Sequence, residues 1–381
     1  MKNELLKKLF ESHKEKRLYH RYITNKHIDP LLHKLKGFAE IKCIGKSVLQ
    51  KPIYTITIGS GEKRILMWSQ MHGNESTTTK ALFDLLETLS EESLATNDIL
   101  NTCTLCIIPI LNPDGAEAYT RTNANQVDLN RDAQALSQPE SKLLRQVFDV
   151  FKPHYCYNLH GQRTIFSAGT TNNPATVSFL APAQDEICTI TANRKVAMEI
   201  IGVMNDRLQT LIPNCVGVYD DAFNLNCVGD TFQNFNVPTI LFEAGHFPND
   251  YGREKTREYI YMSFLISLGY IAKNDVDGGH YQTYFNIPEN DTCFFDIIIR
   301  NANIDGHMVD IGILYQETLQ NDCIEFIPIV EKIELLSSYF GHKEINAKGS
   351  KVFDKDNKPI KTGFANDFVI INNEIFSLLS K

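Results

Sequence analysis

The chain has 381 residues, enough for one large hydrophobic core and a small second domain. Its 43% hydrophobic and 22% charged residues are typical of a globular protein and argue against a disordered one. The formal net charge of −8 argues against a nucleic-acid partner, because contacts to phosphate groups require a basic surface.

The first residues of the chain and its cysteines indicate the cellular compartment in which the protein is expected. The first twenty residues lack the continuous apolar run of a secretory signal, and no later stretch approaches the roughly 18 apolar residues of a membrane helix. Nine cysteines without framework spacing are typical of reduced thiols. We therefore expect a cytoplasmic protein with no membrane partner. Cys103 and Cys106 lie in a predicted buried strand and are interpreted as structural, and the oligomeric state stays open.

Along the chain, a helical lead-in is expected over residues 1–45, because 23–38 carry apolar residues at three- and four-residue intervals. Strands and helices then alternate, which indicates an α/β sheet with helices on both faces. The predicted strands are 52–59, 64–70, 104–111, 154–160 and 238–245, and the predicted helices are 75–89, 138–151, 192–211 and 254–271.

The pattern changes after Lys273, where a polar, glycine-containing segment is followed by short strand-like runs. We expect a catalytic domain over residues 1–275 and a small β-rich domain over 276–381. The second part carries no catalytic motif, and its isolated histidines are interpreted as structural or surface residues: His280, His307 and His342.

The segment QMHGNEST places two potential metal ligands on one turn. His72 and Glu75 stand three positions apart, between a predicted strand and a predicted helix. Ligands of open α/β sheets bind at the carboxyl ends of strands. An imidazole and a carboxylate suit zinc, and a hydrolytic zinc site needs three protein ligands and an open position. The pair alone is a weak signal, because many such pairs are merely solvated.

Two further predicted strands end in groups that could complete such a site. YNLHG ends a strand at His160, a candidate third ligand, and TILFEAG ends another at Glu243, a carboxylate among apolar residues. A polar loop, NPDG followed by TRTNANQVDLNRD, precedes them. Taken singly, His160 could be a core histidine and Glu243 a surface carboxylate. A single site can form only if the two potential ligands of the first turn, His160 and Glu243 all lie at strand ends, and the predicted strands place them there.

The order of four motifs in this chain resembles that of the zinc carboxypeptidase family: H-x-x-E, then R…DLNR, then L-H-G and finally F-E-x-G. The resemblance covers about residues 19–271 and includes the segment IKCIGKSVLQKPIYTITIG. It implies a three-layer α/β/α sandwich with a mixed central sheet, followed in this chain by the small β-rich domain. It also implies that His72, Glu75 and His160 bind one Zn²⁺ per chain.

The resemblance implies catalytic roles for two further residues. Glu243 would be the general base and acid for a zinc-activated water. Arg121, nine positions before Asn130, would polarise the carbonyl of the cleaved bond and stabilise the oxyanion.

Three residues of the D-x-N-R run would support the site. Asn130 and Arg131 would bind the terminal carboxylate of the substrate, to which a guanidinium can bind bidentately. Asp128 would accept a proton from the imidazole of His72 and so orient it.

The sequence departs from the family pattern in places. The nearest candidate for a substrate-closing tyrosine is Tyr219, which lies 24 positions before Glu243 and needs a small insertion, so a packing role is as good an interpretation. Asp132 and Ala133 stand where many relatives have asparagine and an aromatic residue. The segment 228–230, expected to border a specificity pocket, has no decisive signature.

Three functions remain open. The favoured one is a metallocarboxypeptidase that hydrolyses the C-terminal amide bond of small or modified peptides, such as cell-wall fragments. The alternative is an N-acyl amino acid deacylase of the aspartoacylase or succinylglutamate desuccinylase type, which shares HGNE, DLNR, E-x-G and a β-domain. The lead-in and the NPDG loop favour the peptidase, and either enzyme would take a small substrate with a free carboxylate. A binding module without catalysis is disfavoured, because all four key positions are filled.

Overall fold

The computed structural model describes residues 2–91 and 94–380. Its larger part alternates strands and helices, as expected. The helices are α1 (Asn3–His13), α2 (Asn25–Lys34), α3 (Thr77–Ser90), α4 (Leu94–Thr102), α5 (Pro113–Ala118), α6 (Pro139–Phe151), α7 (Ala192–Leu208), α8 (Val228–Asn234) and α9 (Glu254–Lys273), with 3-10 turns η1 (Leu129–Arg131) and η2 (Tyr281–Asn286).

Among the described residues, an eight-stranded mixed sheet forms the centre, in the order β1-β2-β4-β3-β5-β9-β7-β8. Its middle strands β4, β3, β5 and β9 are mutually parallel, and β2 and β7 pair with them antiparallel. The strands are β1 (Glu40–Lys46), β2 (Pro52–Ile58), β3 (Lys63–Ser69), β4 (Cys103–Ile108), β5 (Tyr155–Gly161), β7 (Val177–Leu180), β8 (Val216–Val218) and β9 (Thr239–Ala244).

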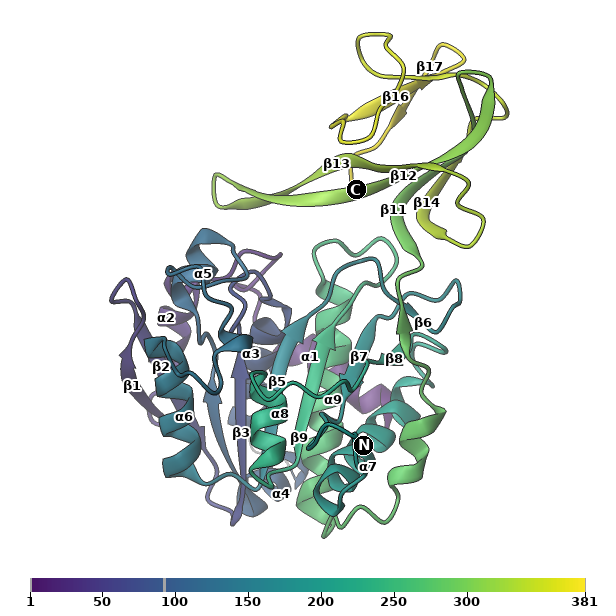
Figure 1. The fold of residues 1–381 in the computed structure, drawn as a ribbon. Helices are drawn as coiled ribbons and strands as arrows, with labels where there is room; N and C mark the ends of the chain where they lie inside the picture. Colours follow the sequence, from purple (N-terminus) through teal and green to yellow (C-terminus); the bar gives the residue numbers. More distant parts are fainter. Residues whose placement is uncertain (1, 92–93, 381) are drawn as a thin grey trace.

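Helices cover both faces of this sheet, so the predicted three-layer α/β/α sandwich is confirmed (Figure 1). One core holds apolar side chains of α1, α2, α3, α4, α7 and α9 against the strands. A smaller core on the opposite face packs Leu144 and Phe148 of α6 and Phe232 of α8 against Trp68 of β3. Burial on both faces explains why the central strands are apolar almost throughout.

The expected lead-in differs from the structure. A helical segment up to residue 45 is wrong, because α2 ends at Lys34 and residues 40–46 form β1. Strand β1 pairs antiparallel with β2 at the edge of the sheet. Its side chains are intermediate or exposed, so it carries no apolar run that would have marked it as a strand.

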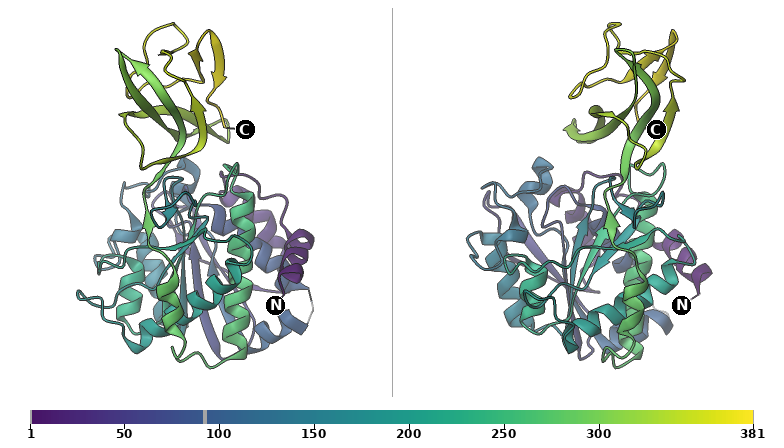
Figure 2. Two further views of the ribbon diagram at one scale, coloured as in Figure 1. Left: turned by 90° about the vertical axis from the view of Figure 1, so that its right-hand side faces the viewer. Right: turned by 45° about the vertical axis from the view of Figure 1, so that its right-hand side comes forward.

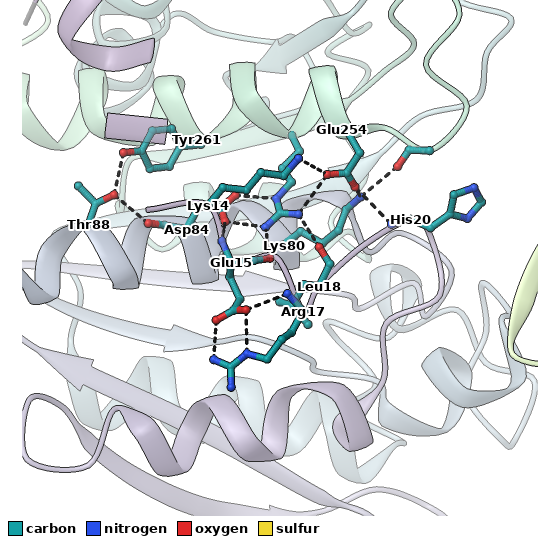
Figure 3. A network of polar contacts seen from close by, with 12 residues as sticks. Lys14, Glu15, Arg17, Leu18, His20, Lys80, Asp84, Thr88, Glu254 and Tyr261 are labelled. Carbon is teal, nitrogen blue, oxygen red and sulfur yellow. Dashed lines mark hydrogen bonds and ion pairs between the residues drawn. The ribbon is translucent and has the colours of Figure 1, made fainter. Parts of the chain in front are cut away.

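A buried ionic network fastens the lead-in to α3 and α9 (Figure 3). Arg257 binds Asp84 at 2.6 Å, with both side chains fully buried, and Asp84 also accepts the backbone N–H of Glu15 at 2.7 Å. Lys80 binds Glu254 at 2.6 Å. Breaking such a pair leaves an uncompensated buried charge, so the network holds the start of α3 in one arrangement.

The chain after η2 forms a β-rich region, as expected. A four-stranded sheet has the order β13-β12-β11-β14, and a small sheet has the order β15-β16-β17. The strands are β11 (Phe294–Ile304), β12 (His307–Gln320), β13 (Cys323–Glu334), β14 (Phe340–Asn346), β15 (Val352–Phe353), β16 (Phe368–Ile371) and β17 (Glu374–Ser377). Apolar side chains from both sheets form a separate core.

The β-rich region sits over one end of the α/β sandwich, and all views place it there (Figures 1 and 2). His342 of β14 stacks on Phe294 and contacts the carbonyl oxygen of Thr164 at 2.8 Å through Nε2, so it is a packed interface residue. The short strand β10 (Asn290–Asp291) also pairs with β6 (Ser167–Ala168).

The sequence analysis expected reduced cysteines and no membrane-spanning helix. All nine cysteines are free, and Cys103 and Cys106 are buried in β4. Within residues 2–91 and 94–380, no helix has the length and apolar character needed to cross a bilayer.

Candidate metal centre and active site

The turn between β3 and α3 carries His72 and Glu75. The chain reaches it through Gln70, whose left-handed φ of 45° is held by its side-chain amide, which donates to the carbonyl oxygens of Ile23 and Gly73. Residue 73 must be glycine, because a Cβ there would lie 1.9 Å from the backbone of Gly115. The turn therefore presents both side chains in one direction: Nδ1 of His72 lies 2.9 Å from Oε1 of Glu75.

Two neighbouring strands bring the other groups to the same place. His160 near the end of β5 pairs in register with Glu243 of β9. Nδ1 of His160 lies 3.0 Å from Oε2 of Glu75 and 3.1 Å from Nδ1 of His72. The same carboxylate oxygen accepts the backbone N–H of Gly161 at 3.0 Å. The three side chains thus offer ligand atoms within 4.8 Å of one another.

The chemistry of these donors fits a metal ion. Nε2 of His72 lies 3.0 Å from Oδ1 of Asp128, an acceptor, so in a neutral ring Nε2 carries the proton and Nδ1 carries a lone pair. That lone pair faces a carboxylate oxygen and a second imidazole nitrogen at about hydrogen-bond distance. Such a convergence of acceptors is stabilised by a cation between them, and two imidazoles with one carboxylate are a zinc donor set.

Electrostatics hold the carboxylates around His72 in their charged forms. Burial alone would raise the pKa of Glu75, but His72 and His160 lower it far below its usual range. Burial also opposes ionisation of Asp128, yet its bond to His72 and the charge of Arg121 lower its pKa strongly. Arg121 donates from Nε to Asp128 at 3.0 Å and approaches Glu75 to 3.6 Å, while half of its side chain remains exposed.

Glu243 has a different environment. Burial, together with the negative charge of Glu75, raises its pKa well above the usual value, while Arg121 and Arg253 counteract this shift. Its buried Oε2 has no hydrogen-bond partner within the described part of the chain. A carboxyl group held in this way next to the donor cluster can exchange a proton with a bound molecule.

The residues of the D-x-N-R run lie beside the cluster on η1. The side-chain oxygen of Asn130 accepts the backbone N–H of Val228, which fastens η1 to the start of α8. Arg131 is exposed, and its Nη1 contacts the carbonyl oxygen of Asn130 at 2.8 Å and Sγ of Cys227 at 3.1 Å. Among the described residues, no carboxylate is bonded to its guanidinium group.

A cavity of about 590 Å³ joins these groups, a volume suited to a small-molecule or peptide ligand. Its lining includes the sequence-predicted residues His72, Glu75, Arg121, Asn130, Arg131, His160, Tyr219 and Glu243. Asp128 stands behind His72 instead. Tyr219 reaches the cavity despite its spacing and packs against Phe166 with ring centroids 5.2 Å apart.

Several lining residues were not predicted from the sequence, and four of them lie outside the predicted motifs. Tyr315 and Glu317 come from β12 in the β-rich region, Arg21 precedes α2, and Arg253 precedes α9. None belongs to a recognisable motif. The docking of β12 over the sandwich brings Tyr315 and Glu317 to the cavity, whereas Arg21 and Arg253 belong to the sandwich itself. No local signal in the sequence identifies any of the four.

Part of the chain matches a known protein family and several of its members. The zinc carboxypeptidase family (peptidase family M14) matches residues 24–189. A probable carboxypeptidase 2 of the fungus Arthroderma benhamiae is 28% identical over 115 residues, 30% of this chain and 21% of that protein. The γ-D-glutamyl-L-diamino acid endopeptidase 1 of Lysinibacillus sphaericus is 39% identical over 80 residues, 19% of this chain and 20% of that protein. The matches thus span about a fifth of each of these relatives.

Solved structures share the fold. A putative carboxypeptidase A from Shewanella denitrificans has a TM-score of 0.56 at 18% identity, covering 66% of this chain and 69% of its own. The carboxypeptidase A of Helicoverpa armigera has a TM-score of 0.53 at 16% identity, covering 71% and 79%. These likenesses concern the fold alone. The resemblance to the zinc carboxypeptidase family is confirmed.

Proposed function

Because residues 24–189 carry the zinc carboxypeptidase domain, we propose that this protein is a metallocarboxypeptidase that hydrolyses the C-terminal amide bond of small or modified peptides. The observation that carries the proposal is the convergence of His72, Glu75 and His160 beside Glu243 in one cavity. We assign the metal to these three side chains. A zinc ion held by them would polarise the carbonyl of the substrate and acidify a water molecule.

The other catalytic roles are assigned to residues of the chain itself. Glu243 takes a proton from the attacking water and returns it to the leaving amine, for which its raised pKa is suited. Arg121, partly exposed at the cavity, donates to the carbonyl oxygen as negative charge develops on it. Asp128 keeps the proton of His72 on Nε2, so that Nδ1 remains a ligand atom.

Asn130 and Arg131 select the substrate end. The guanidinium of Arg131 is exposed at the cavity and has no carboxylate partner among the described residues, so it is free to bind the terminal carboxylate of a peptide. Tyr219, half-buried and lining the same cavity, would cover the bound residue. This requirement for a free carboxylate is what makes the enzyme an exopeptidase.

The bacterial relatives support modified peptides as substrates. One is named γ-D-glutamyl-L-diamino acid endopeptidase 1, and a second, from Vibrio campbellii, is named murein peptide amidase A and is 38% identical over 88 residues. We also propose that residues 1–275 are the catalytic domain and 276–381 a β-rich domain. A reducing, cytoplasmic compartment is supported by the nine free cysteines.

The test is a panel of dipeptides, γ-glutamyl peptides and N-acyl amino acids, assayed with chelator-treated protein before and after zinc is added back. The proposal predicts zinc-dependent release of the C-terminal residue from peptides, and no cleavage of the same peptides with amidated ends. Hydrolysis of N-acetyl or N-succinyl amino acids alone would instead identify the deacylase. No hydrolysis of any member with zinc present would refute both.

A further inference from the structure

Arg253, directly before α9, bonds the main chain at the ends of two neighbouring strands. Its side chain is 1% exposed and lines the cavity. Nη1 donates to the carbonyl oxygen of Ala244 at 2.5 Å and also to that of Gly245. Nη2 donates to the carbonyl oxygen of Gln162 at 2.8 Å. One guanidinium group therefore joins the end of β9 to the residue that follows β5.

These two strand ends carry the general base and one of the metal ligands. Glu243 stands directly before Ala244, and His160 stands two positions before Gln162. The last residue pair of the ladder between β5 and β9 is Gly161 with Ala244, and the backbone N–H of Gln162 then donates to the carbonyl oxygen of Ala244 at 3.0 Å. The guanidinium group thus continues the link between the strands where their ladder ends.

The burial of Arg253 is not explained by a salt bridge. Among the described residues, no carboxylate is hydrogen-bonded to its guanidinium group, and Nε has no partner. Burial and the charge of Arg21 lower the pKa of this group to about 10, although Glu317 and Asp250 counteract the shift. A buried cation is costly. What arginine offers here is a planar set of donors that can bond several carbonyl oxygens at once.

The backbone of Arg253 also indicates that its side chain is needed. Its φ of 59° lies in the left-handed region, which residues other than glycine and asparagine rarely adopt. Capping of α9 does not require the side chain of Arg253, because the carboxylate of Asp250 accepts the backbone N–H groups of Glu254, Lys255 and Thr256. Glycine would suit this turn better, so the bonds of the guanidinium group offset the backbone strain.

We propose that Arg253 is a positioning residue, which fixes the end of the strand that carries Glu243 relative to the end of the strand that carries His160. In this role, Arg253 contacts no reacting atom. A general base acts only within hydrogen-bond reach of the proton that it removes, and a displacement of about 1 Å can cost roughly 10²-fold in rate. The catalytic part of this inference rests on the proposed function, whereas the link between the strands belongs to the fold.

The primary test compares Arg253→Gln with Glu254→Gln. Glu254 is the next residue, but its side chain bonds Lys80 in the network of Figure 3 and is not among the residues that line the cavity. Both variants should unfold at lower urea concentrations than the wild type. With saturating zinc, only Arg253→Gln should lose roughly 10²-fold in kcat, with little change in KM. Unchanged kcat in Arg253→Gln, or the same loss of kcat in both variants, would overturn the proposal.

Two further variants separate the link from charge and from misfolding. Arg253→Lys keeps the positive charge, but its donors sit on one nitrogen and lack the spacing of a guanidinium group. We expect it to lose at least about tenfold in kcat, so wild-type kcat in Arg253→Lys would contradict the assignment. If Arg253→Gln does not fold, Arg253→Gly suits the left-handed backbone and takes its place, with the same expected loss of kcat.

Hydrogen exchange tests the link without any assay of activity. The backbone N–H groups of Gln162 and Gly245 donate to Ala244 and Thr176, respectively. In Arg253→Lys, we expect both to exchange roughly tenfold faster, relative to amides in the middle of β5 and β9, which is the scale of one hydrogen bond to a charged group. Unchanged relative exchange overturns the proposal even if the enzyme is active. Absence of hydrolysis by the wild type refutes the proposed function instead, and the exchange rates still decide whether Arg253 fixes the strand ends.

Discussion

His160 and Glu243 face each other across the ladder between β5 and β9, as neighbours in register. Paired residues of adjacent parallel strands place their side chains on the same side of the sheet. One strand therefore presents a ligand nitrogen and the next a carboxyl group, at a separation set by the backbone. A sheet buried on both faces cannot shift this register without exposing its apolar side chains, so the relative position of the two groups is rigid.

Replacing the general base should separate metal binding from catalysis. We expect Glu243→Gln to bind zinc with nearly the wild-type stoichiometry and to lose roughly 10²–10⁴-fold or more in kcat, because the proton acceptor is removed and the ligands remain. Metal analysis and steady-state kinetics measure the two effects. Glu331→Gln, at an exposed position of β13, is the matched control. Near-normal turnover in Glu243→Gln would show that another group is the base.

The carboxylate behind His72 should affect metal affinity. In Asp128→Asn, the amide no longer requires the proton on Nε2 of His72, so the ring can present the wrong tautomer to the metal. We expect zinc affinity to fall by roughly 10–100-fold, measured by competition with a chromophoric chelator. Asp149→Asn, on the exposed side of α6, serves as the reference. Unchanged affinity would mean that Asp128 does not orient the ligand.

The substrate anchor should act on binding. Arg131→Ala is expected to raise KM for peptides with a free C-terminal carboxylate, with a smaller change in kcat, because the interaction is made in both the ground state and the transition state. Peptides with amidated ends should be affected little by the substitution. Equal losses with both kinds of peptide would exclude Arg131 as the anchor.

Acid should weaken the network that joins the lead-in to α3 and α9. Burial alone would raise the pKa of Glu254, but Lys80, Arg257 and Lys14 lower it to about 2, below its ordinary 4.5. The carboxylate therefore stabilises the fold above about pH 4.5, and this contribution is lost as the pH falls from 4.5 toward 2. It amounts to at most about 3 kcal/mol.

Urea unfolding of wild type and Glu254→Gln at several pH values tests this linkage. The variant should be less stable at pH 7, and its free energy of unfolding should change less between pH 4.5 and 2.5. Parallel curves for the two proteins would show that Glu254 does not contribute to the acid sensitivity. Glu331→Gln is again the control.

Much of the α/β part was predictable because its signals are local. Apolar runs at 64–70 and 154–160 coincide with β3 and β5, since strands covered on both faces are uniformly apolar. Strand β1 was missed because an edge strand has no such run. Tyr219 was doubted on spacing alone, and the structure brings it into the cavity because distance along the chain does not measure distance across a sheet.

The donor cluster could be predicted from the sequence by itself, because His72 and Glu75 share one turn. His160 and Glu243 stand at the ends of two strands that their apolar residues make recognisable, and these strands are adjacent in the sheet. The tertiary structure alone decided that Arg21 and Glu317 line the same cavity. Arg21 and Glu317 are 296 positions apart and meet only when β12 docks over the sandwich. Long-range docking depends on the complementarity of two folded surfaces, and no short motif encodes it.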